Sequence, residues 1–209
     1  MAIVSQEQAP TNIGGSEARM LWIDGVGGFL VVPGEEWLIG GPGSGDSVEI
    51  NINGDLSRRA AAIRRQGSDY ILQPLSETRL GGDRLDRPSP LRDKDIFGLG
   101  GSVEMVFRKT HPLSASAMLR MATRHRTEPR CDGIVLLADT CVIGPGKGAH
   151  ISCPDWSSDV ILYTTRGVWQ IRSDEQMSID GQSVGQRAPL PQTCTIEGES
   201  IRMSLEPTR

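Results

Sequence analysis

The sequence predicts an all-β protein made of two tandem β-sandwich domains, and three observations support this. First, 25 glycines and 13 prolines among 209 residues, with apolar runs that rarely exceed five residues, favour short strands joined by tight turns. Second, apolar and polar residues alternate along many segments, as in a sheet with one solvated face. Third, the chain repeats its order of motifs once, at the spacing of one sandwich domain.

The alternation is clearest near the end of each half of the chain. One face of each expected strand collects the apolar residues, which are Val103, Met105 and Phe107 in the first half and Ile201, Met203 and Leu205 in the second. No stretch longer than a turn or two keeps the apolar spacing of a helix. Both halves are therefore predicted to be all-β.

The internal repeat relates residues 18–50 to residues 117–151. Each segment contains an apolar strand, a turn, a strand of four apolar residues after glycine, and a strand that ends at Ile-Gly. Further along, residues 80–85 parallel residues 179–184, and residues 94–100 parallel residues 198–204. Matching positions lie about 99 to 104 residues apart, which is the size of a sandwich domain and much longer than a solenoid repeat.

The joint between the two halves is predicted within residues 109–116, where Pro112 and small polar residues interrupt the alternation. We therefore expect a flexible leader (1–16), a first sandwich (17–109), a linker (110–116) and a second, degenerate sandwich (117–207). The leader has neither the basic nor the apolar region of a signal peptide, and no run approaches the roughly 18 apolar residues of a membrane span. A cytoplasmic protein with no membrane partner is expected.

Net charge argues against a dedicated nucleic-acid binder, because the chain carries −4 at pH 7 and has a pI of about 5.4. Two runs rich in arginine, residues 57–65 and 120–130, are exceptions to this acidic balance. We interpret both as solvated strand faces or loops. Nucleic-acid binding by these runs is kept as a minor alternative.

Metal and nucleotide sites are not predicted. The four cysteines form no C-x-x-C pair, and His150 with Cys153 supplies at most half of a four-ligand zinc site. The glycine-rich loop around Lys147 lacks the Ser/Thr and the following helix of a nucleotide-binding P-loop. We therefore expect no metal and no cofactor.

Catalysis is not predicted either. Residues 181–185 spell G-x-S-x-G, but a nucleophile elbow needs a helix after its serine, and Pro189 and Pro191 block one. The three histidines have no neighbours that spell a triad or a metal-binding helix. The protein is expected not to be an enzyme.

The order of these motifs resembles the forkhead-associated (FHA) domain family, in two divergent copies that cover nearly the whole chain. The matches in the first half are Ile39-Gly40, Ser57-Arg58-Arg59-Ala60, Thr78-Arg79-Leu80-Gly81-Gly82 and the segment 94–100. Those in the second are Ile143-Gly144, Ile179-Asp180-Gly181 and Gly198-Glu199-Ser200-Ile201. The resemblance implies two FHA-like (SMAD/FHA) sandwiches, a fold whose members read phosphothreonine peptides.

The resemblance also implies a candidate phosphopeptide site in the first copy, with Ser57, Arg58, Arg59, Thr78 and Arg79 as its residues. The loop backbone at Gly41 and Gly43 completes that candidate site. The sequence departs from the family where the pattern has arginine after Ile-Gly, since Gly41 and Pro145 stand there, and where it has histidine, since Ala60 stands there. The second copy offers Ser157 and Ser158 with Lys147 and is expected to be a structural partner.

The expected function is a non-catalytic protein–protein interaction module that recognises a phosphothreonine peptide through its first copy. The alternative is a structural module of the same fold that has lost phosphopeptide binding and forms homo-oligomers through strand edges.

Overall fold

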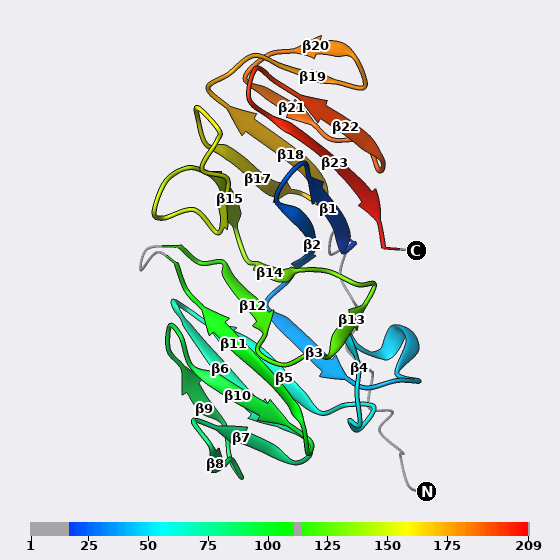
Figure 1. Ribbon diagram of the computed structural model, residues 1–209, viewed down its shortest axis with the longest axis vertical. Coiled ribbons are helices and arrows are strands. Elements are labelled where there is room, and N and C mark those ends of the chain that lie inside the picture. Colours follow the sequence, from blue (N-terminus) through cyan, green and yellow to red (C-terminus); the bar gives the residue numbers. More distant parts are fainter. Residues whose placement is uncertain (1–16, 111–113, 209) are drawn as a thin grey trace, which may run out of the picture.

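The structure, a computed structural model, describes residues 17–110 and 114–208. These residues form three sheets of twelve, six and five strands, and their helical content is one short 3-10 turn, η1 (Gly45–Ser47). The sheets pack as two sandwiches, one above the other in Figure 1, so the predicted all-β sandwich fold is confirmed. The predicted leader (1–16) and residues 111–113 of the predicted linker lie outside the described residues. No helix among those described has the length and apolar character needed to cross a membrane.

The lower sandwich has the six-stranded sheet as one layer. In spatial order its strands are β13 (Arg126–Glu128), β4 (Ile50–Asn53), β3 (Glu36–Gly40), β5 (Ala61–Gln66), β6 (Asp69–Pro74) and β9 (Ser89–Leu91). The other layer is one half of the twelve-stranded sheet, with strands β14 (Gly133–Leu137), β12 (Ala117–Met121), β11 (Val103–Arg108), β10 (Ile96–Leu99), β7 (Thr78–Leu80) and β8 (Asp83–Arg84).

The upper sandwich repeats this plan. Its five-stranded sheet has the order β16 (Ile151–Ser152), β15 (Thr140–Gly144), β17 (Val160–Thr165), β18 (Val168–Ser173) and β21 (Arg187–Pro189). It packs against the other half of the large sheet, whose strands are β2 (Gly27–Pro33), β1 (Arg19–Ile23), β23 (Arg202–Pro207), β22 (Cys194–Glu197), β19 (Met177–Ile179) and β20 (Gln182–Val184).

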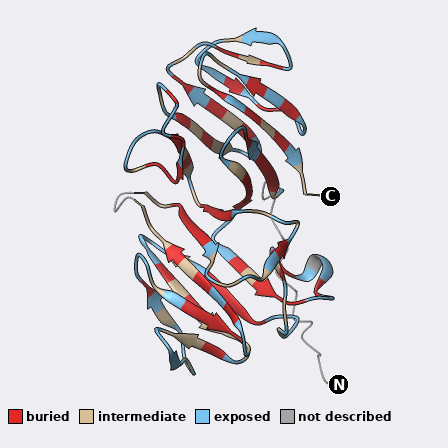
Figure 2. Ribbon diagram, viewed as in Figure 1, coloured by how far each residue is buried: buried red, intermediate tan, exposed pale blue. Residues whose placement is uncertain are grey.

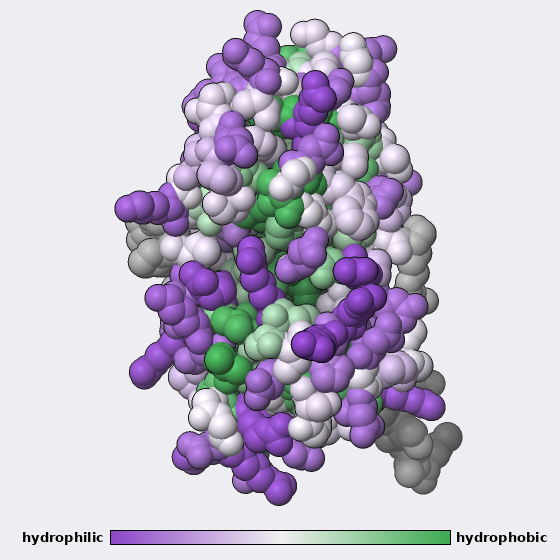
Figure 3. Space-filling view, in the orientation of Figure 1, coloured by the Kyte–Doolittle hydropathy of each residue, from purple (hydrophilic) through white to green (hydrophobic). Residues whose placement is uncertain are grey.

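Each sandwich buries its own aromatic core. In the lower core, Trp37 stacks on Tyr70 with ring centroids 5.9 Å apart, and Phe107 packs on the other side of Tyr70 at 5.2 Å. In the upper core, Trp169 is buried and carries the guanidinium of Arg19 over its ring at 5.4 Å. Buried residues follow the inner faces of the strands in both sandwiches (Figure 2). On the face drawn in Figure 3, hydrophobic residues lie in small groups among hydrophilic ones.

The two sandwiches meet at β2 and β14, which pair in parallel at the centre of the large sheet. Leu30 and its partner Ile134 face the lower core, whereas Val31 and its partner Val135 face the upper core. The two cores therefore lie on opposite faces of one continuous sheet. This explains why both strands are unbroken apolar runs and not alternating ones, since strands covered on both faces have no solvated side.

Strand pairing crosses the predicted boundary between the two halves. The first strand, β1, does not pair with β11; it pairs with β23, and β12 takes the place beside β11. As a result β1 and β2 complete the upper sandwich, while β12 and β14 complete the lower one. The division into 17–109 and 117–207 stays a prediction about the repeat, because each sandwich takes strands from both of those segments.

The two Ile-Gly corners occupy equivalent places. Each ends a strand that pairs in parallel with the next short strand, Ile39 with Ile50 on β4 and Ile143 with Ile151 on β16. The predicted parallel between residues 94–100 and 198–204 is wrong. The counterpart of β10 is β22, because each lies between the strand that follows it in the chain (β11 or β23) and a short hairpin strand (β7 or β19). Alternating apolar residues in both β22 and β23 made the two segments hard to tell apart by pattern.

Candidate functional site

The candidate site is the rim of the lower sandwich, where β3 and β4 end and β5 begins. In Figure 1 this rim lies at the lower right. The loop after β3 is tied to the loop before β5, because the amide of Gly41 donates to the carbonyl of Ser57 (3.0 Å) and Ser44 Oγ donates to the carbonyl of Arg58 (2.6 Å). The backbone that carries the predicted basic residues is therefore held in place by neighbouring loops.

Three of the predicted site residues present free side chains at this rim. Ser57, Arg58 and Arg59 are exposed, and their side chains form no hydrogen bond or ion pair with any described residue. The carbonyls of Ser57 and Arg58 accept the hydrogen bonds that hold the loop, while the hydroxyl and the two guanidinium groups remain available to a ligand. The arrangement offers one neutral donor and two permanent positive charges on adjacent residues.

Thr78 and Arg79 are placed differently from the prediction. Thr78 is 1% exposed, and its hydroxyl donates to the carbonyl of Ser76 at 3.0 Å. Arg79 pairs with Glu77 at 3.2 Å and donates to the carbonyl of Gly100 at 3.0 Å. Thr78 is thus bonded within its own loop and Arg79 ties that loop to Gly100, so neither side chain is free for a ligand.

The two predicted loop glycines also differ from each other. Gly41 is buried, and a Cβ built on it would lie 2.5 Å from the carbonyl oxygen of Leu56. The arginine that the FHA pattern has at this position therefore has no room unless the loop before β5 moves. Gly43 is exposed and has open space around it. Its φ of 79° is a backbone conformation that glycine adopts easily, so glycine fits this loop tip for conformational reasons.

The matching rim of the upper sandwich is closed by a side chain that sequence reasoning missed. The carboxylate of Glu175 accepts hydrogen bonds from the hydroxyls of Ser157 (2.5 Å), Ser158 (2.9 Å) and Ser200 (2.9 Å), and from the amide of Ser200 (3.3 Å). Burial opposes ionisation of this carboxylate, but the four hydrogen bonds outweigh it and lower the pKa of Glu175. The hydroxyls of Ser157 and Ser158, which the sequence offered as ligand donors in the second copy, are therefore already hydrogen-bonded to the carboxylate of Glu175.

Replacing Glu175 with alanine should lower the free energy of unfolding by about 1–2 kcal/mol at neutral pH, because the loop that carries Ser157 and Ser158 and the loop that carries Ser200 lose a shared charged acceptor. A lowered folded-state pKa stabilises the protein above the ordinary glutamate pKa of about 4.3, and this stabilisation disappears as the pH falls through the lowered value. Urea denaturation between pH 3 and 7 measures the effect. Glu199→Ala, an exposed neighbour without hydrogen-bonding partners among the described residues, is the control; equal losses for both variants would contradict the role of Glu175.

The H-x-x-C pair does not form a metal site. The Nδ1 of His150 accepts a hydrogen bond from the amide of Val142 (2.9 Å), and its Nε2 lies 2.8 Å from the hydroxyl of Ser114. Both ring nitrogens are thus used inside the protein. Among the described residues, no group of three or more His, Cys, Asp and Glu side chains is placed to hold a metal ion.

The G-x-S-x-G string lies on a hairpin and not on a nucleophile elbow. Ser183 belongs to β20, an edge strand that follows a turn at Asp180 and Gly181, both with positive φ. The next element is the strand β21 and not a helix, so the serine lacks the strand-to-helix turn that would raise its hydroxyl above a sheet.

Comparison with known proteins gives one similar structure. No family model and no curated protein matches the sequence. A solved structure titled "Rv0020c_FHA Structure" is similar to this chain at 23% sequence identity and a TM-score of 0.32, covering 98% of that chain and 47% of this one. At this level of similarity the match identifies no ligand, partner or site residue of this chain.

Proposed function

We propose that this protein is a non-catalytic interaction module that binds a phosphothreonine-containing segment of a partner protein at the rim of the lower sandwich. The observation that carries the proposal is the exposed run Ser57, Arg58 and Arg59, whose side chains are unpaired among the described residues while its backbone is fixed by Gly41 and Ser44.

The chemistry of this run suits a phosphate group. A phosphorylated threonine carries about −1.5 to −2 charges at pH 7 and three acceptor oxygens. A guanidinium can donate two parallel hydrogen bonds to such a group, and a hydroxyl adds a third. Because the loop is already ordered, binding requires little backbone rearrangement, which favours affinity.

The rim offers fewer phosphate-binding side chains than the FHA family pattern does. Gly41 occupies the position of the arginine after Ile-Gly, and steric contact with Leu56 keeps any side chain out of it. Ala60, at the position of the histidine, is fully buried. Recognition therefore depends on Arg58 and Arg59.

The proposal predicts that a Ser57→Ala/Arg58→Ala double variant binds phosphothreonine peptides at least about 10-fold more weakly than the wild-type protein, since charged hydrogen bonds contribute about 1.5–3 kcal/mol each. Isothermal titration against a phosphothreonine peptide library, with unphosphorylated copies of each peptide, measures this. Arg187→Ala removes the same charge from an exposed, unpaired position of the upper sandwich and should bind as the wild-type protein does. Indifference of the wild-type protein to phosphorylation would overturn the proposal.

Self-assembly through strand edges is the weaker candidate. The six edge strands of the three described sheets, β8, β9, β13, β16, β20 and β21, are each two or three residues long. Such short edges present few unpaired backbone groups to a second copy.

A further inference from the structure

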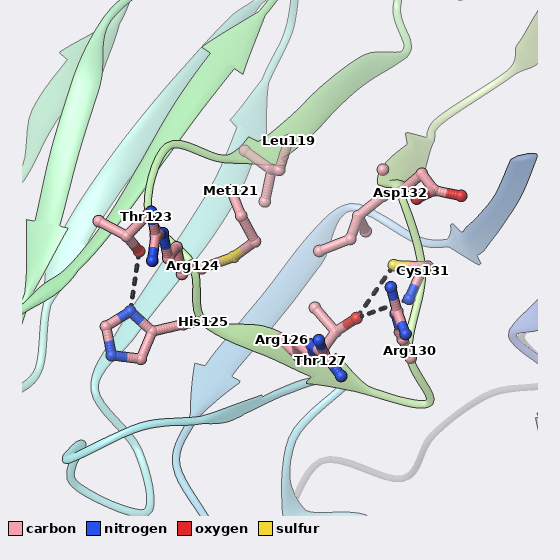
Figure 4. Close-up of a pocket in the computed structure, with 12 residues that line it drawn as sticks. Leu119, Met121, Thr123, Arg124, His125, Arg126, Thr127, Arg130, Cys131 and Asp132 are labelled. Atoms are coloured by element: carbon pink, nitrogen blue, oxygen red, sulfur yellow. Dashed lines mark hydrogen bonds between the residues drawn. The ribbon is translucent and has the colours of Figure 1, made fainter.

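The second basic run of the sequence encloses a pocket and does not lie flat on the surface. The chain leaves β12, passes through residues 122–125 into β13, and returns through residues 129–132 to β14 (Figure 4). This excursion surrounds a cavity of about 250 Å³. β13 is anchored by pairing with the edge strand β4, Arg126 opposite Asn53, so the outer wall of the pocket is part of a sheet.

The charge of the pocket is strongly positive. Arg124, Arg126 and Arg130 line it, all three are exposed, and none forms a hydrogen bond or ion pair with a described residue. The acidic residue of the lining, Asp132, is already engaged, because its Oδ2 accepts the amide of Gly28 at 2.8 Å. Three guanidinium groups against one carboxylate leave a positive balance of charge around the cavity, which favours an anionic ligand.

The polar side chains of the walls are fixed by one another. Thr123 Oγ1 lies 2.8 Å from His125 Nδ1, and Thr127 Oγ1 accepts the amide of Cys131 at 3.1 Å. Figure 4 shows these two pairs on opposite sides of the pocket, with an arginine near each. Burial raises the pKa of the Cys131 thiol, so this thiol adds no charge to the wall at pH 7.

The floor of the pocket is apolar. Leu119 and Ile134 are buried core residues that reach the cavity, and the partly buried Met121 lies beside them. A ligand that fits therefore combines an anionic head with a small apolar body. The volume is below the 300–1,000 Å³ usual for drug-sized ligands, which limits that body to about one ring.

We propose that this pocket binds a small phosphomonoester, with the phosphate held by the guanidinium groups of Arg126 and Arg130 and the organic group lying against Leu119, Met121 and Ile134. Arginine is the residue best suited to phosphate, because its planar donors match two phosphate oxygens at once. The site is distinct from the run Ser57–Arg59, although Gly54, at the start of that loop, lies next to His125. The two ligands can therefore be tested separately.

The test is isothermal titration of the whole protein with phenyl phosphate, inorganic phosphate and phenol. Phenyl phosphate should bind at least about 10-fold more tightly than inorganic phosphate, because only it also buries apolar surface, and phenol should not bind detectably. Arg126→Ala and Arg130→Ala should each weaken phenyl phosphate binding by about 10-fold or more. Arg187→Ala, outside both proposed sites, should leave it unchanged.

Either of two results would overturn the proposal: the absence of phenyl phosphate binding at concentrations on the order of 10 mM, or equal affinity of the wild-type protein and the two pocket variants. If phenyl phosphate does not bind and Arg126→Ala and Arg130→Ala lose phosphothreonine peptide binding, the pocket is instead part of the peptide site. Circular dichroism melting of each variant confirms that the fold is retained.

Discussion

Replacing Leu30 with alanine is expected to lower the free energy of unfolding by about 3 kcal/mol, the usual loss for a buried leucine that leaves a cavity. Leu30 is 2% exposed and lies on β2, which is hydrogen-bonded to β1 on one side and to β14 on the other. Because these strands are covered on both faces, their neighbours are held in place and cannot shift to fill the cavity. Urea denaturation measures the change, and Val168→Ala, at a 46% exposed position, should shift stability by less than about 0.5 kcal/mol.

The same substitution should destabilise both sandwiches together. Leu30 faces only the lower core, yet its strand also carries Val31 into the upper core, so neither core can open without disturbing the other. Hydrogen exchange of amides in β5 and β17 reports the two sandwiches separately. Equal acceleration in both is the expected result; acceleration confined to β5 would show that the sandwiches unfold independently.

Replacing Gly40 with alanine should be at least as damaging, with a loss of about 3 kcal/mol or more. A Cβ at this position would lie 1.9 Å from the carbonyl oxygen of Arg58 and 2.8 Å from Ser44 Oγ. The closest atom belongs to the backbone, so no side-chain rotation relieves the contact, and the loop that carries Arg58 must shift. Thermal and urea denaturation measure the loss of stability.

The control for this substitution is Gly101→Ala. Gly101 has open space around its built Cβ and no positive φ, so its replacement should change stability by less than about 0.5 kcal/mol. The Gly40 variant should also lose phosphothreonine peptide binding at a temperature where it is still folded. Unchanged stability would mean that the loop before β5 yields easily and is not held as tightly as its hydrogen bonds indicate.

The local features of the fold could be predicted from the sequence because they depend on neighbouring residues. Both Ile-Gly corners end strands, as predicted, and the segments 80–85 and 179–184, which were predicted to correspond, both form hairpins. In each case a glycine or proline next to an apolar run marks the position at which the strand must stop.

Long-range pairing could not be predicted in the same way. β1 could pair with either β11 or β23, which have similar alternating sequences, and nothing in residues 19–23 favours one of these partners. The unbroken apolar runs of β2 and β14 were a usable signal, because they exceed what a sheet with one solvated face requires. These runs indicate that β2 and β14 each have a hydrophobic core on both faces.

The placement of the candidate site residues could be predicted only in part, for a related reason. Exposure of Ser57, Arg58 and Arg59 follows from their place between two strands, which the sequence shows. Burial of Thr78 depends on tertiary packing, and the capture of Arg79 depends on the carbonyl of the distant Gly100; the sequence shows neither. Glu175 escaped notice because a single glutamate in a polar segment carries no pattern until three serines converge on it.

The crossed placement of the first strands gives the molecule the form of a domain-swapped dimer whose two protomers share one polypeptide. In an ordinary swapped dimer the arms return to their own subunits on dilution, so stability depends on protein concentration. Here the exchanged arms are covalently tethered, and dilution cannot separate them. The two rims are thereby kept in a constant mutual orientation, which a pair of sandwiches joined by a flexible tether would lack.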